Sequence, residues 1–319
     1  MHTRVNRRTF LQTSAGLAAA ARTSLAADIP IIDTHIHLFD PTRPQGVPWP
    51  PKDNAKLHKP ALPDRYRKLV AGFSVAGAIE VEASPWLEDN QWVLDIAAKD
   101  TLIVGMIGDL EPDKPDFRTN LDRFRRNPLF LGIRYGNLWG RDFTAALSKP
   151  EFMRGMKMLA AGNFTLDTAN PSPAMTIDLL KLTDAVPSLR IVIDHLPRMN
   201  PPDDAAARRA YDSDLSKLAK RPQVYVKMSG VLRPAGGRVP TDMAFYKPRL
   251  DSLYDLFGPD HVVYGSDWPN SDNWGTYAEG LTVVREYFAT KSAEAAAKYF
   301  WKNSQAAYRW KKRDASQPG

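Results

Sequence analysis

The chain has 319 residues, 43% hydrophobic and 25% charged, a composition that excludes disordered, collagen-like and fibrous proteins. Its formal charge is +7, which falls to +3 without the four arginines of an acid-free leading segment, and so weak an excess does not favour a nucleic-acid binder. Because cysteine is absent, disulfides, zinc ribbons and Cys nucleophiles are excluded, and any metal must be held by His and carboxylates.

Residues 1–26 are predicted to be a twin-arginine signal peptide. Arg7 and Arg8 are followed by Phe10, an Ala- and Leu-rich stretch over 13–21, and small residues before Ala27, the order expected for an exported precursor. The apolar stretch is shorter than the roughly 20 residues of a bilayer span, so we expect no permanent membrane span. An ordinary amphipathic N-terminal helix is the alternative. We therefore expect export by the twin-arginine translocase and a periplasmic mature chain.

The mature chain, residues 27–319, alternates short apolar runs with segments of helical spacing. Runs rich in β-branched residues and bounded by Gly, Pro or Asp are typical of strands buried on both faces. Helical spacing lies between them over 92–99, 153–161, 175–185, 212–220 and 246–257. The eight predicted strands are 29–37, 75–83, 102–110, 129–137, 164–168, 189–195, 224–229 and 262–267.

Eight alternations predict a single α/β domain with the (β/α)8 TIM-barrel fold. A doubly wound parallel sheet is the rival, but neither G-x-G-x-x-G nor G-x-x-x-x-G-K-[ST] occurs. The Pro-rich segment 40–65, with Trp49 and His58, follows the first strand. Because barrel active sites are built from loops at the carboxyl ends of strands, we expect this segment to be a lid or rim.

Polar side chains gather at the ends of three predicted strands. His35 and His37 end the first strand, His195 ends the sixth, and Asp267 ends the eighth. Residues two apart on a strand share a face, so the first two imidazoles point the same way, and barrel closure brings the carboxylate beside them. Neutral imidazoles so arranged can share one divalent cation or polarise one substrate group.

The segments carrying these residues resemble the amidohydrolase superfamily, specifically the amidohydrolase-related (amidohydrolase 2) branch that contains 2-pyrone-4,6-dicarboxylate lactonase and sugar-acid lactonases. The resemblance extends over nearly the whole mature chain. Its motifs are Thr34-His35-Ile36-His37, Gly105-Met106-Ile107-Gly108, Gly132-Ile133-Arg134, Ile193-Asp194-His195, Val226-Lys227-Met228-Ser229-Gly230, Gly265-Ser266-Asp267-Trp268-Pro269 and Phe300-Trp301-Lys302-Asn303.

The resemblance implies roles for the matching residues. Asp267 would be the general base that takes a proton from the attacking water, while His195, His35 and His37 polarise the carbonyl or contribute to a metal site. Arg134 would bind a substrate carboxylate, because a guanidinium pairs with one bidentately; a local salt bridge is the alternative. Lys227 would be an anion contact or simply a charge at a strand end.

The chain also departs from the superfamily pattern. The fourth strand offers Arg134 and Tyr135, and the fifth offers Asp167 and Asn170 but no His, so a binuclear centre is not expected. We expect at most one divalent metal, with zinc favoured and His35 and His37 as ligands, and a reaction without metal stays open. Glu82 stands on the second strand where the lactonase branch commonly has Gln. It could be a ligand, a second acid, a substrate contact or the partner of a cation.

We therefore expect an exported hydrolase that opens the lactone ring of a small molecule bearing carboxylate or hydroxyl groups. A metal-dependent decarboxylase of the same superfamily is the first alternative. A periplasmic ligand-binding protein without turnover is the second, although such a protein usually has two lobes with a hinge. No nucleic-acid partner is expected, and the oligomeric state stays open.

Overall fold

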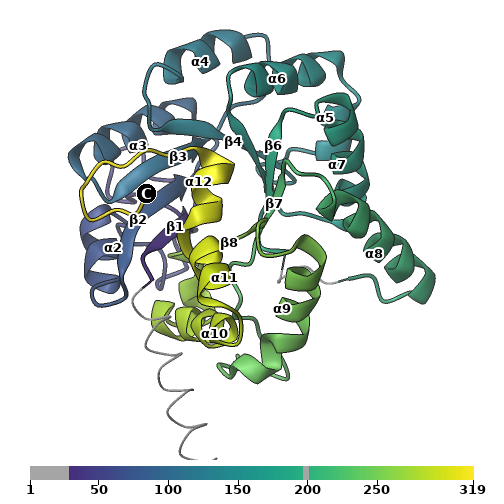
Figure 1. Cartoon of the computed structure of the whole chain (residues 1–319). Coiled ribbons are helices and arrows are strands. Elements are labelled where there is room, and N and C mark those ends of the chain that lie inside the picture. The colour runs from purple at the N-terminus through teal and green to yellow at the C-terminus, as the bar shows by residue number, and fades with distance from the viewer. Residues whose placement is uncertain (1–28, 197–200) are drawn as a thin grey trace, which may run out of the picture.

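Eight parallel strands form a ring surrounded by helices (Figure 1). The structure, a computed structural model, describes residues 29–196 and 201–319. Neighbouring strands pair in chain order, and the ring closes where Ile36 bridges Trp268 in parallel. The strands are β1 (Ile31–Ile36), β2 (Val75–Val81), β3 (Ile103–Gly108), β4 (Phe130–Gly136), β5 (Thr165–Ala169), β6 (Arg190–Ile193), β7 (Val224–Lys227) and β8 (Val262–Val263). The predicted single (β/α)8 barrel is confirmed, and the doubly wound alternative is wrong.

β6 and β8 are among the strands that end before their predicted apolar runs do. β6 ends at Ile193, and β8 ends at Val263. Beyond them, His195 and Asp267 adopt positive φ angles of 49° and 63°, a conformation that non-glycine residues rarely take. These turns lead the chain out of the sheet, so both functional candidates lie on loops held by strands rather than on the strands themselves.

The helices predicted from hydrophobic spacing begin two to seven residues earlier in the structure, and three of them follow a polar N-cap residue, which is Ser172, Asp204 or Asp242. For example, α8 begins at Ala205, where the side chain of Asp204 accepts a hydrogen bond from the amide of Ala207. The helices are α2 (Pro63–Leu69), α3 (Leu87–Lys99), α4 (Phe117–Phe124), α5 (Phe143–Leu147), α6 (Pro150–Ala161), α7 (Pro173–Ala185), α8 (Ala205–Ala219), α9 (Met243–Phe257), α10 (Tyr277–Ala289), α11 (Ala293–Ala297) and α12 (Asn303–Tyr308).

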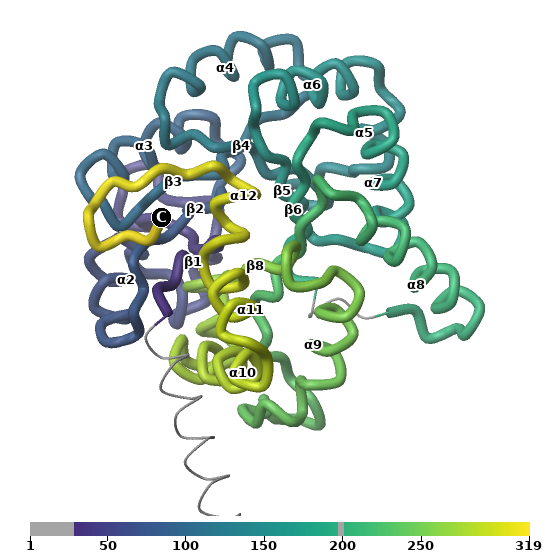
Figure 2. Tube along the Cα trace, in the orientation of Figure 1, coloured from purple at the N-terminus to yellow at the C-terminus, as the bar shows by residue number. Residues whose placement is uncertain are grey.

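The C-terminal segment covers one end of the ring, as Figure 2 shows for α12 and the tail that follows it. Tyr308 and Trp310 are buried and pack with apolar side chains of the strands. Further along, the guanidinium of Arg313 donates to main-chain oxygens of Ala97 and Ile103. The amino-terminal third of the barrel is thus fastened by residues more than two hundred positions away.

The predicted signal peptide, residues 1–26, lies outside the described residues. Among residues 29–196 and 201–319, no helix has both the length and the apolar character needed to cross a membrane.

Candidate active site

Asp267 lies at the seam that closes the barrel, where the residues after β8 run beside β1. Gly265 approaches β1 so closely that a Cβ there would lie 2.8 Å from the Cβ of His35. Only glycine therefore allows these two segments to lie so close together. The amide of Asp267 then donates to the main-chain oxygen of His35 (2.8 Å). Its carboxylate is held from the loop side, where Asn270 Nδ2 donates to Oδ2 (2.9 Å). The other oxygen, Oδ1, is directed to the imidazoles.

Three imidazoles surround Asp267 Oδ1. Their Nε2 atoms lie at 3.7 Å for His35, 3.3 Å for His37 and 3.5 Å for His195. All four side chains are largely or wholly buried. The structure therefore brings together the four residues that the sequence placed at three strand ends.

The first two imidazoles differ in what their second nitrogen contacts. His37 Nδ1 lies 2.7 Å from the main-chain oxygen of Val81, and because a carbonyl only accepts, this nitrogen carries the proton and a neutral ring has its lone pair on Nε2. His35 Nδ1 instead lies 2.9 Å from the Nζ of Lys227. Burial, reinforced by that ammonium, sets the pKa of His35 well below its ordinary value, so this ring is neutral.

A chain of buried charges supports this group from inside the barrel. Asp194 Oδ2 accepts from Arg134 Nε (2.8 Å), and its Oδ1 lies 3.1 Å from Lys227 Nζ. Lys227 also donates to Asp167 Oδ2 (2.6 Å). Burial by itself would raise the pKa of Asp194, but Lys227 and Arg134 hold it well below its ordinary value. Burial raises the pKa of Asp167 to about 6 despite Lys227.

Glu82 forms another part of the site wall. Its Oε2 accepts a hydrogen bond from the indole nitrogen of Trp139 (2.8 Å), and its Oε1 lies 3.8 Å from Arg134 and 3.6 Å from Arg141. Burial raises the pKa of Glu82 to about 8, with the arginines acting in the opposite direction. A carboxyl that keeps its proton at neutral pH is an additional hydrogen-bond donor in the wall.

These groups line a cavity of about 180 Å³. This volume is below the range of roughly 300–1,000 Å³ that takes drug-sized ligands, so the cavity suits one small ring. Trp49 from the predicted lid contributes to it, whereas His58 contacts the main-chain oxygen of Pro50 instead. The lining residues are His37, Trp49, Glu82, Ala83, Arg134, Leu138, Trp139, Asn170, His195, Asp267 and Asn270.

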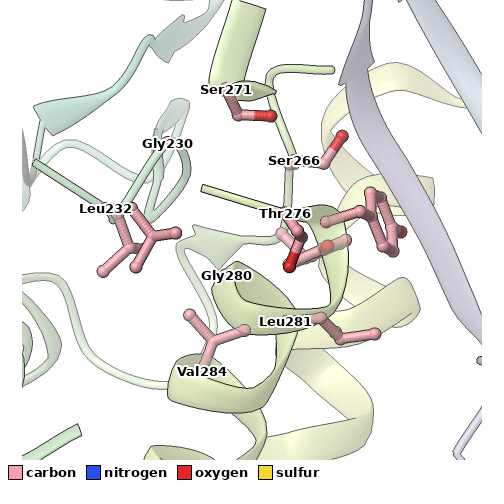
Figure 3. Close-up of a pocket in the computed structure, with 12 residues that line it drawn as sticks. Gly230, Leu232, Ser266, Ser271, Thr276, Gly280, Leu281 and Val284 are labelled. Carbon is pink, nitrogen blue, oxygen red and sulfur yellow. The ribbon is translucent and has the colours of Figure 1, made fainter. Parts of the chain in front are cut away.

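A second pocket lies behind the loop that carries Asp267 (Figure 3). It has Leu232 on one side and Ser266 and Leu281 on the other. At about 20 Å³ it has room for roughly one water molecule. It cannot take a substrate.

A possible single-metal site coincides with part of the imidazole group. One ligand atom each from His35, His195 and Asp267 lie within 4.8 Å of one another, and imidazole nitrogen with carboxylate oxygen suits Zn²⁺. His37 is not in this group, so its predicted part as a ligand stays a prediction. The distances between these atoms fit one ion, and each ligand nitrogen must offer its lone pair to the metal.

Two predicted substrate contacts are occupied by protein groups. Arg134 lines the cavity, yet its Nε is bonded to Asp194, the local pairing considered as the alternative to substrate binding. Lys227 is fully buried and does not line the cavity. Their roles toward a substrate stay predictions.

Sequence reasoning assigned no role to Asp194 and Asn270, and it did not connect Trp139 with Glu82. The first two were within reach, because they stand in or next to the motifs that contain His195 and Asp267. Trp139 gave no such signal, since its indole reaches Glu82 through a loop turn with φ of 59°.

Comparison with known proteins assigns a family to this arrangement. A family model described as amidohydrolase matches residues 32–310. An L-fucono-1,5-lactonase from Burkholderia ambifaria is 28% identical over 78% of this chain and 83% of its own length. Among solved structures, an amidohydrolase from Burkholderia multivorans with bound zinc has a TM-score of 0.76 at 21% identity, covering 88% of this chain and all of its own. A putative 2-pyrone-4,6-dicarboxylic acid hydrolase from Pseudomonas putida has a TM-score of 0.70 at 18% identity, covering 88% and 98%.

Proposed function

Because the chain belongs to the amidohydrolase family, we propose that it is a hydrolase that opens the ring of a small sugar-acid lactone with water activated by Asp267. The observation that carries this proposal is a buried carboxylate oxygen ringed by three imidazoles at the edge of a small polar cavity. The similarity to an L-fucono-1,5-lactonase supports the substrate class.

The reaction begins with a water molecule bound at Asp267 Oδ1. As the water oxygen attacks the lactone carbonyl carbon, its proton passes to the carboxylate. The contact of 3.3 Å between Oδ1 and His37 Nε2 gives that proton a second acceptor, because a neutral His37 has its lone pair there. His195, which lines the cavity, can donate to the carbonyl oxygen when its Nε2 carries the proton.

The ring then opens as the bond from the carbonyl carbon to the ring oxygen breaks. The departing ring oxygen takes the proton held at Asp267, which restores the base. The product is a hydroxy acid that ionises and releases one proton. A divalent metal, if bound at the His and Asp ligand atoms, would act as a Lewis acid on the carbonyl; at most one ion per chain is expected, zinc being favoured.

The charges in the wall favour a hydroxylated lactone without a carboxylate. Arg134, the cationic group of the cavity lining, is already paired with Asp194 and faces Glu82. A carboxylate on the substrate would have to compete with Asp194 for this guanidinium. The Nδ2 atoms of Asn170 and Asn270 donate to protein oxygens, which leaves their amide oxygens to accept from hydroxyl groups. The ring of Trp139 is suited to the face of a sugar ring.

The test is a proton-release assay with the purified chain on 1,5- and 1,4-lactones of sugar acids, beside a dicarboxylated pyrone. We expect turnover of a sugar-acid lactone, with the open hydroxy acid identified by mass spectrometry. Carbon dioxide release would support the decarboxylase alternative instead, and saturable binding without turnover would support the binding protein.

We further propose that this enzyme acts in the periplasm after export by the twin-arginine translocase. The paired Arg7 and Arg8 and the small residues before Ala27 support this proposal.

A further inference from the structure

Lys227 is a fully buried lysine whose ammonium group contacts three side chains of the protein. Its Nζ lies 2.6 Å from Asp167 Oδ2, 3.1 Å from Asp194 Oδ1 and 2.9 Å from His35 Nδ1. An ammonium has three hydrogens and no lone pair. The ammonium is ion-paired with both carboxylates, and it donates hydrogen bonds to Asp167 Oδ2 and to His35 Nδ1.

This arrangement decides where His35 carries its proton. Because Nδ1 accepts from Lys227, the neutral ring must carry its proton on Nε2. That Nε2 atom is buried, has no hydrogen-bond partner among the described residues, and lies 3.7 Å from Asp267 Oδ1. His35 is therefore an N–H donor directed toward the base, the opposite of the tautomer found for His37.

We infer that Lys227 is a positioning residue that holds His35 in the Nε2–H tautomer and so keeps it from acting as a metal ligand. Lys227 does not line the cavity, so it acts on the site through His35 rather than by touching a substrate there. The two first-strand imidazoles therefore differ at the nitrogen nearest to Asp267. His35 carries a proton on its Nε2, and His37 has a lone pair there.

Removal of the ammonium should reverse the tautomer of His35. His35 Nδ1 lies 3.5 Å from Asp194 Oδ1, and an ionised carboxylate can only accept. Without Lys227, the proton on the ring is drawn to Nδ1, and the lone pair of Nε2 becomes available beside His195 and Asp267. A carboxylate behind the second nitrogen is the usual support of a metal-binding histidine.

The test compares the wild-type chain with Lys227→Met, and uses Lys247→Met as the matched control. Lys247 is an exposed helix lysine whose charge pairs with Asp251. Nitrogen NMR of histidine-labelled protein, with His35 assigned from His35→Gln, is expected to show Nε2–H in the wild type and Nδ1–H in Lys227→Met. Zn²⁺ titration by calorimetry is expected to show binding about 10- to 100-fold tighter in Lys227→Met. The control should match the wild type in both measurements.

A wild-type His35 protonated on Nδ1, or a folded Lys227→Met variant with unchanged tautomer and unchanged Zn²⁺ affinity, would overturn the inference. Removing Lys227 leaves two buried carboxylates without their cation, which can prevent folding. The double variant Lys227→Met with Asp167→Asn removes one charge of each sign and gives the same two readouts. If neither variant folds, the wild-type tautomer alone decides.

Only the effect on rate rests on the proposed function. Loss of the donor directed at Asp267 should lower kcat of Lys227→Met on a lactone and leave KM nearly unchanged. The NMR and Zn²⁺ measurements use no substrate, so an error in the proposed reaction and an error in the assigned tautomer give different results.

Discussion

At the scale of single residues, Asp267 Oδ1 is the atom on which the site converges. Three imidazole nitrogens face it, and Asn270 fixes the other oxygen of the same carboxylate. The proposed base is thus oriented by its neighbours rather than by its own rotamer alone. Two substitutions test what this carboxylate and the nearby Glu82 contribute.

Asp267→Asn should keep the fold and lose most of the turnover, because the amide retains the shape but cannot take the proton. A general base typically contributes about 100- to 10,000-fold in rate. Steady-state kinetics on the identified lactone measure the loss. Asp272→Asn, which changes a carboxyl on the same loop that pairs with Arg65, is the matched control. A folded Asp267→Asn retaining over a tenth of the rate would show that another group is the base.

Glu82→Gln should make stability less sensitive to pH. Burial raises the pKa of Glu82 to about 8 in the folded chain, whereas its ordinary value is near 4.3. Between these values the folded state holds a proton that the unfolded state has lost, so wild-type stability falls as pH rises. The Tm of Glu82→Gln minus that of the wild type should therefore increase from about pH 5 to pH 8 and level off above. Parallel pH profiles would contradict the assignment.

The sequence predicted the members of the site better than their connections. H-x-H, D-H and G-S-D-W-P mark His35, His37, His195 and Asp267, since strand period and barrel closure place them together. The sequence could not show that the side chain of Lys227 lies inside the barrel. Its position depends on the direction of a long side chain and on contacts with residues of β1, β5 and the end of β6.

At the scale of elements, the seam between β1 and β8 depends on one buried carboxylate. Asp33 Oδ1 accepts from the amide of Ser266 (2.8 Å), and its Oδ2 accepts from Tyr66 (2.7 Å) and more distantly from Tyr277. The seam is therefore tied to α2 and α10 at the position just before Asp267. All eight strands were predictable from their apolar runs. The early ends of β6 and β8 were not, because positive φ at a non-glycine residue leaves no sequence signal.

Asp33→Asn should destabilise the fold. It replaces a carboxyl oxygen that accepts buried hydrogen bonds with an amide nitrogen that cannot accept, and a buried donor left unsatisfied costs about 1–3 kcal/mol. Denaturant unfolding should show that the free energy of unfolding of Asp33→Asn falls by at least this amount. Asp64→Asn, at an exposed position of α2, should stay within about 0.5 kcal/mol of the wild type. Equal stability of the two variants would mean that the seam does not depend on this carboxylate.

At the scale of the whole molecule, the proposed export depends on the leading segment, residues 1–26. Replacing Arg7 and Arg8 with Lys should abolish periplasmic accumulation, because the paired arginines are the feature that the translocase recognises. Cell fractionation followed by immunoblotting measures this, with Arg22→Lys as the control outside the pair. Normal periplasmic levels of the double variant would count against this route.

The contacts between the C-terminal tail and the first strands also bear on the order of folding, because these strands complete their packing only after the tail has been synthesised. β1 leaves the ribosome early, yet Tyr308 and Arg313, which contact the strands and the end of α3, emerge some 270 residues later. At about 5–20 residues per second, β1 waits roughly 14 to 54 seconds for these residues. During synthesis the strands made first have unpaired edges, because the ring closes only through Ile36 and Trp268. A chaperone that shields nascent β-strands should therefore raise the yield of folded protein. A fusion at the carboxyl end should lower that yield.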